Sequence, residues 1–568
     1  MTSSSRYNHL ISPLIQVSDT SVPLLKKNRL RFIHTLNIQV VEPSLLNNLK
    51  SCIKHTKRIR TLNTGCPSKR LNDAIASSLK GLQRLYVVKD QDSTLNPKTI
   101  KTMHRRLSTL QFYRGAYKLQ EIPIFRSLRE VQELEVKIKE KSGFKPIKLE
   151  TLGAKTRYIH GMKRLGVMTL RTTLADFLDL MERLPRTKRF KLRSFELDLP
   201  KDVDKLNLSL LSKIEGLEVN SASKGFVEFF AKNIDRFENL DSLQLSQNGP
   251  TILKLNEFKD YALFSRFSHL ESLKFIKLYF RFPFPATPQS LAFFDELRLP
   301  KNLTKLSLNF ANVSLNQEKG YIASSSFGRI FKQIEGFKQL TSLHLNIDLA
   351  REAENDLDSF LRVLPLNLPN LKAIFLDFFS GAEFIAVNLA EIFKWASTHK
   401  NLEYLHLTMP GIKYQGFDSS ELQNLTFEKL RIMHVMSSNR NYFSRKGFGD
   451  FLKFVSGIKE LRTLHFNCWG SDCTPADIQD VADYVVKLEK LENLTFSVDA
   501  QNVDYEEFLV FKEILKSLKS LRYLYLFIRK RGYDLPLEIT QRFENEFSDE
   551  KNRMKNSLGF YVNQQTLL

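Results

Sequence analysis

Histidine is the residue type whose positions in this sequence could carry chemistry. The chain has 568 residues and 11 histidines, and His344, His406, His434 and His465 occupy equivalent places in separate short apolar segments. Imidazole groups held close together could bind a metal ion, or repel one another when they are protonated. Whether the four rings can do either depends on the secondary-structure elements that position them.

A recurring apolar motif surrounds these histidines. The pattern L-x-x-L-x-x-L-x-L, with Ile, Met, Phe or Val allowed, appears in HKNLEYLHL, FEKLRIMHV, IKELRTLHF and LKSLRYLYL. Its final offset of two is that of a strand, and the offsets of three before it indicate a turn that leads into the strand. At intervals of about 30 residues, the first strand residue is predicted at Leu243, Leu273, Leu306, Leu343, Ile374, Leu405, Met433, Leu464, Leu494 and Leu524.

Between these strands the apolar residues follow a helical period. Phe448, Phe451 and Val455, for example, share one face of a predicted helix. Strands that are joined by helical crossovers are parallel, and such units can bury their apolar sides only by stacking on their neighbours. The sequence therefore predicts an α/β solenoid with parallel strands on its concave face and helices on its convex face.

In its motif and unit length the sequence resembles the leucine-rich repeat superfamily, and most of all its ribonuclease-inhibitor-like class. That resemblance implies a horseshoe of irregular repeats. The asparagine that the family places five residues after the first strand leucine is present as Asn248 and absent from most other units. We expect a polar N-terminal arm or cap (residues 1–27), degenerate basic repeats (28–236), regular repeats (237–535), and a C-terminal capping helix and tail (536–568).

Alternation along a strand places the residue after each first strand residue on the concave face. This predicted concave column reads Gln244, Lys274, Ser307, His344, Phe375, His406, His434, His465, Thr495 and Tyr525. Three interpretations are open: contact with a protein partner, a metal or pH-sensitive site, and cross-strand packing alone. The column contains no Asp, Glu or Cys, so we assign no metal ligands. The candidate partner-binding residues are His344, Phe375, Tyr404, His406, His434, His465, Tyr523 and Tyr525.

The formal net charge is +23 at pH 7, and residues 1–200 hold 39 Lys and Arg against 16 Asp and Glu. Such an excess suggests that an acidic partner, a nucleic acid or an anionic membrane contacts the N-terminal third; a solvated basic surface is the alternative. The predicted basic edge consists of Lys54, Lys57, Arg58, Arg60, Arg105, Arg106, Arg186, Lys188 and Arg189.

Targeting and redox signals are weak. The N-terminus lacks the pattern of a secretory signal, and no apolar run approaches the roughly 20 residues that span a bilayer. We expect a cytoplasmic protein without a transmembrane segment, with the nucleus as the alternative location. The 4 cysteines are too few and too scattered for a disulfide framework, which favours free thiols.

No catalytic motif accompanies the repeats. The sequence contains no G-x-x-x-x-G-K-[ST], H-E-x-x-H or G-x-S-x-G pattern. We therefore expect no enzyme activity and no cofactor. The sequence predicts a non-catalytic scaffold that binds a protein partner through its concave face; the alternative is an adaptor for nucleic acid or an anionic membrane that uses the basic N-terminal third.

Overall fold

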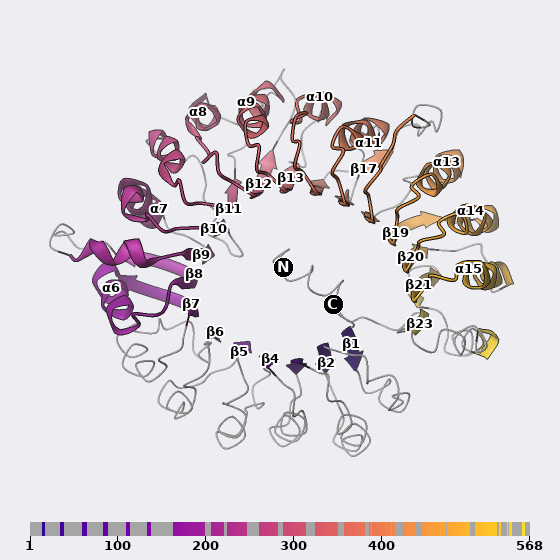
Figure 1. Ribbon diagram of the computed structural model, residues 1–568, viewed down its shortest axis with the longest axis horizontal. Coiled ribbons are helices and arrows are strands. Elements are labelled where there is room, and N and C mark those ends of the chain that lie inside the picture. The colour runs from indigo at the N-terminus through magenta and orange to yellow at the C-terminus, as the bar shows by residue number, and fades with distance from the viewer. Residues whose placement is uncertain are drawn as a thin grey trace, which may run out of the picture. The chain divides into compact units, whose positions relative to one another are not determined.

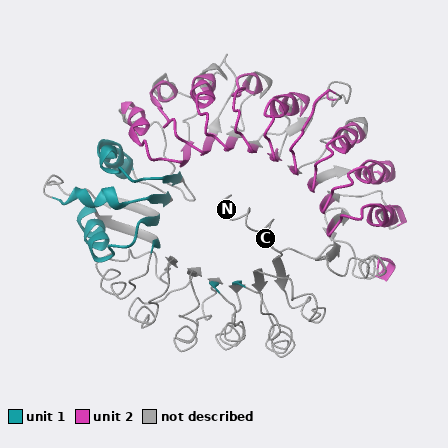
Figure 2. Cartoon of the chain, viewed as in Figure 1, with its two compact units in different colours: residues 1–252 teal, residues 253–568 magenta. Residues whose placement is uncertain are grey.

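Parallel strands and the helices that connect them make up the computed structural model of this chain (Figure 1). It divides into two compact units, unit 1 (residues 1–252) and unit 2 (residues 253–568) (Figure 2). The structure describes residues 14–17, 35–38, 60–64, 83–88, 109–113, 133–137, 163–198, 206–220, 224–246, 261–281, 288–313, 324–349, 357–380, 385–387, 389–409, 412–414, 422, 424–438, 445–472, 474–499, 506–530, 533–534, 542, 545–547 and 559–562.

In unit 1 each strand pairs in parallel with the next one along the chain. The helices α6 (Leu174–Arg183) and α7 (Lys224–Lys232) and the 3-10 helices η7 (Leu208–Lys213) and η8 (Ile234–Arg236) connect the later strands. The strands are β1 (Leu14–Val17), β2 (Thr35–Ile38), β3 (Thr61–Thr64), β4 (Arg84–Val88), β5 (Thr109–Tyr113), β6 (Glu133–Lys137), β7 (Arg164–Thr173), β8 (Arg189–Asp198), β9 (Gly216–Asn220) and β10 (Ser242–Ser246).

Unit 2 repeats this arrangement, with strands on its inner side and helices on its outer side (Figure 1). Its parallel strands are β11 (Phe275–Arg281), β12 (Lys305–Val313), β13 (Ser342–Leu349), β14 (Ala373–Ser380), β16 (Tyr404–Thr408), β18 (Ile432–Ser438), β19 (Thr463–Asp472), β20 (Asn493–Asp499), β21 (Tyr523–Lys530) and β23 (Gly559–Val562). Short β15 (Ile385–Val387) and β17 (Ile412–Tyr414) pair separately, and β22 (Tyr533–Asp534) is antiparallel to β21.

The connecting helices of unit 2 carry the apolar faces that their sequence predicts, and Phe451 and Val455 of α13 are buried. Thr474 caps α14, because its side chain accepts a hydrogen bond from the Asp477 N–H in a capping box. The helices are η10 (Ala262–His269), α8 (Pro288–Glu296), α9 (Ser324–Glu335), α10 (Leu357–Arg362), α11 (Leu389–Ser397), α13 (Arg445–Ser456), α14 (Pro475–Val485), η11 (Glu506–Val510) and α15 (Phe511–Ser517). The predicted α/β leucine-rich repeat solenoid is confirmed.

Phenylalanine rings join the repeats of unit 2 between the strands and the helices. Phe280 and Phe293 have ring centroids 4.5 Å apart, and Phe294 and Phe327 have centroids 4.9 Å apart. Phe327 also meets Phe360 of the next helix at 5.2 Å, in an edge-to-face contact. Each fully buried side chain of this size stabilises the fold by about 1.5–3 kcal/mol relative to an exposed one, so the rings make neighbouring repeats depend on one another.

Asparagine also links the turns of successive repeats, at a position other than the one the family resemblance indicates. Asn248 lies outside the described residues. Instead, the asparagine directly before the buried turn leucine donates its Nδ2–H to a backbone carbonyl of the preceding repeat. Asn239, Asn302, Asn370 and Asn401 do so at 2.8, 3.0, 2.8 and 2.7 Å.

One predicted register is wrong. Leu273 is buried in the turn, and the first inward-facing residue of β11 is Ile276, which pairs with Leu306. Lys277, rather than Lys274, therefore occupies the concave column. The sequence allows both registers, because Leu273 and Phe275 fit the motif as well as Ile276 and Leu278 do.

Strands also lie in the two terminal segments. β1 falls within residues 1–27, for which the sequence predicts a polar arm or cap, and it pairs with β2. β23 falls within residues 536–568, predicted to be a capping helix and tail, and it pairs in parallel with β21. The division of the chain at residues 28, 237 and 536 stays a prediction.

Candidate functional site

The concave face of unit 2 brings the predicted histidines into one row. His344 pairs with Phe375, Phe375 with His406, His406 with His434, and His434 with His465 on successive strands. Because each of these residues lies between two core-facing ones, their side chains share one face of the sheet. Local strand periodicity is enough to align them.

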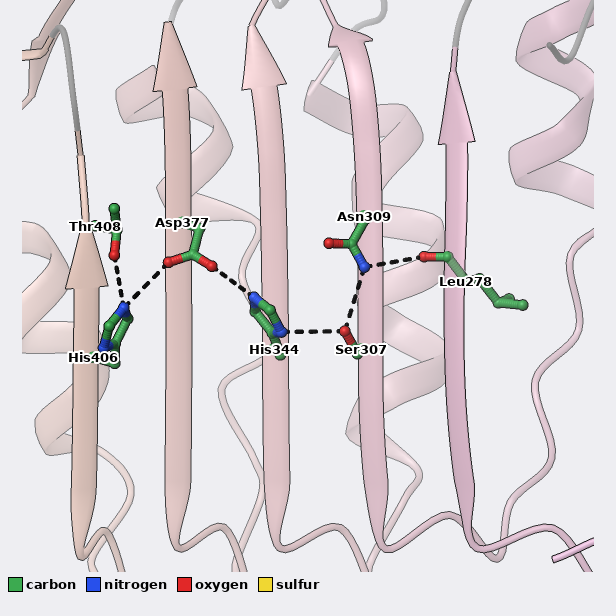
Figure 3. A network of polar contacts seen from close by, with 7 residues as sticks. All are labelled: Leu278, Ser307, Asn309, His344, Asp377, His406 and Thr408. Carbon is green, nitrogen blue, oxygen red and sulfur yellow. Dashed lines mark hydrogen bonds and ion pairs between the residues drawn. The ribbon is translucent and has the colours of Figure 1, made fainter. Parts of the chain in front are cut away.

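A polar network crosses five strands at this row (Figure 3). His344 Nε2 lies 2.8 Å from Asp377 Oδ2, and His344 Nδ1 lies 3.2 Å from Ser307 Oγ. On the other side of Asp377, His406 Nε2 is 3.4 Å from Oδ1 and 2.6 Å from the Thr408 hydroxyl. One carboxylate therefore connects two imidazoles from different repeats.

Asp377 is a site residue that the sequence analysis missed. It lies in the concave column adjacent to the predicted one, where it pairs with Thr408. Burial acts to raise the pKa of the Asp377 carboxyl, but hydrogen bonds and opposite charge from His344 and His406 hold that pKa well below its usual range. The signal was available, because the residue two positions after Phe375 points to the same face.

The other two imidazoles stack farther along the row. The ring centroids of His434 and His465 are 5.1 Å apart, and those of His406 and His434 are 5.7 Å apart. Burial lowers the pKa of His465 to about 4, and the nearby His406 adds to this effect. Burial, followed by the charges of His465 and His406, lowers the pKa of His434 well below its usual value. Both rings are therefore neutral near pH 7.

Two ring nitrogens in this row are buried and lack a hydrogen-bond partner among the described residues. They are His406 Nδ1 and His434 Nε2. The other nitrogen of His434, Nδ1, lies 3.3 Å from the Tyr404 hydroxyl. In the described part of the chain, no group of three His, Cys, Asp or Glu side chains is arranged to hold a metal ion.

Accessibility divides the eight predicted partner-binding residues into two sets. His344, Phe375, Tyr404 and His434 are buried against their neighbours on the sheet. The other four are half-buried, so a partner can reach their side chains: His406, His465, Tyr523 and Tyr525.

Ser307, His344 and Asp377 have the order of a nucleophile, a base and an acid, but their surroundings favour a structural role. Ser307 is only 5% exposed, and its hydroxyl oxygen also lies 3.4 Å from Asn309 Nδ2. Acyl transfer needs free donors for an oxyanion, whereas β12 and β13 are each paired on both sides. The hydrogen bonds among these three side chains therefore help to hold β12, β13 and β14 in register.

The predicted basic edge belongs to unit 1 and is partly neutralised. Lys188 Nζ lies 2.5 Å from Glu215 Oε1, and Arg189 lies 2.6 Å from Asp241 Oδ2. Arg186 is exposed, as is Arg60. The remaining members lie outside the described residues: Lys54, Lys57, Arg58, Arg105 and Arg106. Whether this edge binds a partner stays a prediction.

Comparison with known proteins adds solved structures of similar architecture. An internalin (InlF) from Listeria monocytogenes is 12% identical, with a TM-score of 0.35 over 72% of this chain and 91% of its own. A leucine-rich repeat protein of Leptospira interrogans is 15% identical, with a TM-score of 0.32 over 88% of this chain and 97% of its own. TLR13, solved in complex with ssRNA13, is 15% identical, with a TM-score of 0.37 over 92% of this chain and 74% of its own.

Neither a protein-family model nor a curated protein matches the sequence. None of the described helices combines the length and the apolar character that crossing a membrane takes.

Proposed function

We propose that the protein is a non-catalytic repeat scaffold that binds a protein partner through the concave face of unit 2, between β16 and β21. The supporting observation is the chemistry of this face. Its three described columns consist of Tyr404, Ile432, Thr463, Asn493 and Tyr523; His406, His434, His465, Thr495 and Tyr525; and Thr408, Met436, Asn467 and Ser497.

Lys, Arg, Asp and Glu are absent from these three described columns, although they make up 26% of the chain. The centres of protein interfaces are depleted of charge and enriched in aromatic residues and Met in the same way. Half-buried Ile432, Met436, Tyr523 and Tyr525 supply apolar and aromatic contact area. A phosphate backbone would find no cation at these positions.

The face is also preformed, because each of its strands is held in register by its neighbours. A rigid surface loses little conformational entropy when it binds, which favours affinity. The buried network around Asp377 stabilises the adjoining strands. Tyr and Trp are frequent binding hot spots, so we expect Tyr523 and Tyr525 to contribute most.

Two substitutions test the proposal. Thr495→Arg places a long charged side chain among His465 and Tyr525, and Tyr525→Ala removes contact area. Ser517→Arg, on the exposed end of α15, is the matched control for added charge. Partners are identified by quantitative affinity purification from cells, and each one is then measured with purified proteins.

We expect at least one partner to bind the purified wild-type protein and the Ser517→Arg control equally. Its affinity should fall about 30-fold or more in each concave variant, which corresponds to the loss of about 2 kcal/mol that defines a hot spot. If every purified partner binds the Thr495→Arg and Tyr525→Ala proteins as it binds the wild type, the concave face is not the binding surface.

A further inference from the structure

The turns that precede the strands of unit 2 project a row of exposed cations. In each repeat three turn residues stand five, four and two places before the first inward-facing strand residue. From β11 to β21 these positions hold twice as many Lys and Arg residues as Glu residues. We call them the basic rim: its cations are Lys274, Lys301, Lys338, Lys372, Lys400, Lys429, Arg431, Lys459, Arg462, Lys490, Lys519 and Arg522, and its anions are Glu271, Glu403, Glu428, Glu460, Glu489 and Glu492.

The rim is continuous, because the turns of successive repeats touch. The Lys372 carbonyl accepts backbone N–H bonds from both Glu403 and Tyr404, at 2.8 and 2.9 Å. Side chains bridge the same turns, with Lys372 Nζ 3.3 Å from Glu403 Oε1 and Arg462 3.2 Å from Glu492. Since neighbouring strands are about 4.8 Å apart, the rim presents a closely spaced line of charge.

Half of the rim cations are exposed lysines for which the described residues provide no partner. Six exposed lysines have no ion-pair or hydrogen-bond partner for their ammonium groups among the described residues: Lys274, Lys301, Lys338, Lys400, Lys459 and Lys519. An exposed cation without a partner contributes little to stability. A row of them on one edge raises the local positive potential and attracts anions.

We propose that the basic rim binds the phosphate backbone of a single-stranded nucleic acid. A polynucleotide carries one negative charge per residue along a line, which matches one or two cations per repeat along the rim. The rim turns lead into the strands that line the curved inner side of unit 2 (Figure 1). A flexible single strand can follow that curve, whereas a duplex is stiff over about 150 base pairs.

The same positions disfavour other anionic partners. They hold no aromatic or large aliphatic side chain, and among the described residues only Leu366 is a large hydrophobic group that is exposed. The rim therefore offers nothing to insert into a bilayer. Without aromatic groups to stack on bases, binding is independent of sequence and dominated by phosphate contacts.

This charge row differs from the basic edge of unit 1. Residues 201–568 carry as many acidic as basic residues, so composition alone does not reveal the rim. The structure separates the charges, because the turns that precede strands recur at one edge of the unit. In unit 1 the equivalent Lys188 is paired with Glu215.

Fluorescence anisotropy of a labelled oligothymidylate of about 30 nucleotides tests the proposal on the full-length protein. The test variant combines Lys338→Glu, Lys400→Glu and Lys459→Glu. The matched control combines three exposed helix lysines, as Lys332→Glu, Lys453→Glu and Lys516→Glu, and changes the net charge equally. Substituting Gln at the three rim positions gives a second, milder variant in case the reversed charges impair folding.

We expect the wild-type protein to bind with a Kd of about 10 µM or tighter at 50 mM salt, in the range of non-specific binding. Removal of three phosphate contacts should weaken binding about 100-fold at 0.1 M salt and reduce the salt slope by about two, since each contact to a single strand contributes about 0.7. The helix triple should stay within about threefold of wild type, because its lysines lie off the rim.

Three results would overturn the proposal. One is the absence of oligothymidylate binding by the wild-type protein at 50 mM salt, and another is equal weakening in the rim and helix triples. The third is binding of phosphatidylserine vesicles or of an oligoglutamate peptide without binding of the oligonucleotide, which would assign the rim to a membrane or to an acidic protein. Tyr525→Ala should bind oligothymidylate normally, so this test is independent of the concave-face proposal.

Discussion

His399 makes part of the stability of unit 2 dependent on pH. It stands three residues before the turn leucine Leu402, where other repeats have a buried apolar residue: Phe237, Phe337, Leu368, Phe427, Ile458, Leu488 and Leu518. His399 is 4% exposed, its ring packs against Trp395 at 5.2 Å, and its Nε2 has no hydrogen-bond partner among the described residues. Burial lowers its pKa to about 4.

The sign of the effect follows from this lowered pKa. Between about pH 6.5 and 4 the unfolded chain binds a proton at His399 that the folded chain does not, so acidification favours unfolding. With a pKa of about 4 in the folded state and 6.5 in the unfolded state, the loss between pH 7 and pH 5 is about 2 kcal/mol. The contribution is fully present above pH 6.5 and disappears toward pH 4.

Replacing His399 with Leu should remove this dependence. Hydrogen exchange of the Leu402 N–H, which donates to the His399 carbonyl at 2.9 Å, reports the free energy of local opening. Local exchange is preferable to a global melting curve, because repeats need not unfold together. From pH 7 to pH 5 the opening free energy of the wild type should fall about 2 kcal/mol more than that of the variant.

The same substitution at the exposed His269 is the control and should leave the pH profile of Leu402 exchange unchanged. His434 and His465 titrate in the wild type and in both variants, so their contribution cancels from the difference. If the wild-type and His399→Leu profiles run parallel between pH 7 and pH 5, then burial of His399 does not set its proton affinity.

Two further predictions concern contacts between repeats. Asp377→Asn replaces the carboxylate that contacts two imidazoles with an amide, which keeps only one oxygen and no charge. The free energy of local opening of β14 and β16, measured by hydrogen exchange, should fall by about 1–3 kcal/mol at pH 7. Unchanged exchange rates in both strands would contradict a stabilising role of the network. Asn401→Ala removes the donor to the Pro369 carbonyl and the acceptor for Lys429 Nζ, each at 2.7 Å. It should cost about 1 kcal/mol in turn stability, whereas Asn401→Asp should keep only the Lys429 contact and give an intermediate loss.

Local patterns predict most of the fold. Strand periodicity aligned His344, His406, His434 and His465, because the two-residue alternation and the repeat length are both properties of short segments. The register of β11 was not predictable in this way. Two overlapping apolar patterns compete there, and the contact of Ile276 with Leu306 on the next strand selects one of them.

Contacts between repeats are where the sequence was least informative about the site. Asp377 contacts His344 and His406, which lie 33 residues before it and 29 residues after it. Because both imidazoles come from other repeats, the residues next to Asp377 in the sequence do not reveal these contacts. The contacts of the turn asparagines were not predicted for a related reason. Their acceptors are backbone carbonyls of the preceding repeat, which every residue type has, so the sequence does not mark them.

The same geometry explains how one unit can present two surfaces of opposite character. Strand residues of the concave columns face neighbours about 4.8 Å away on both sides, so an unpaired charge there would repel the next equivalent charge and lose part of its hydration. Asp377 is retained because two imidazoles flank it. Turn residues point into water, where charge costs little. Between β16 and β21, repetition therefore separates the three described concave columns, which contain no Lys, Arg, Asp or Glu, from a charged rim. Substitutions in one of these surfaces should leave binding at the other intact.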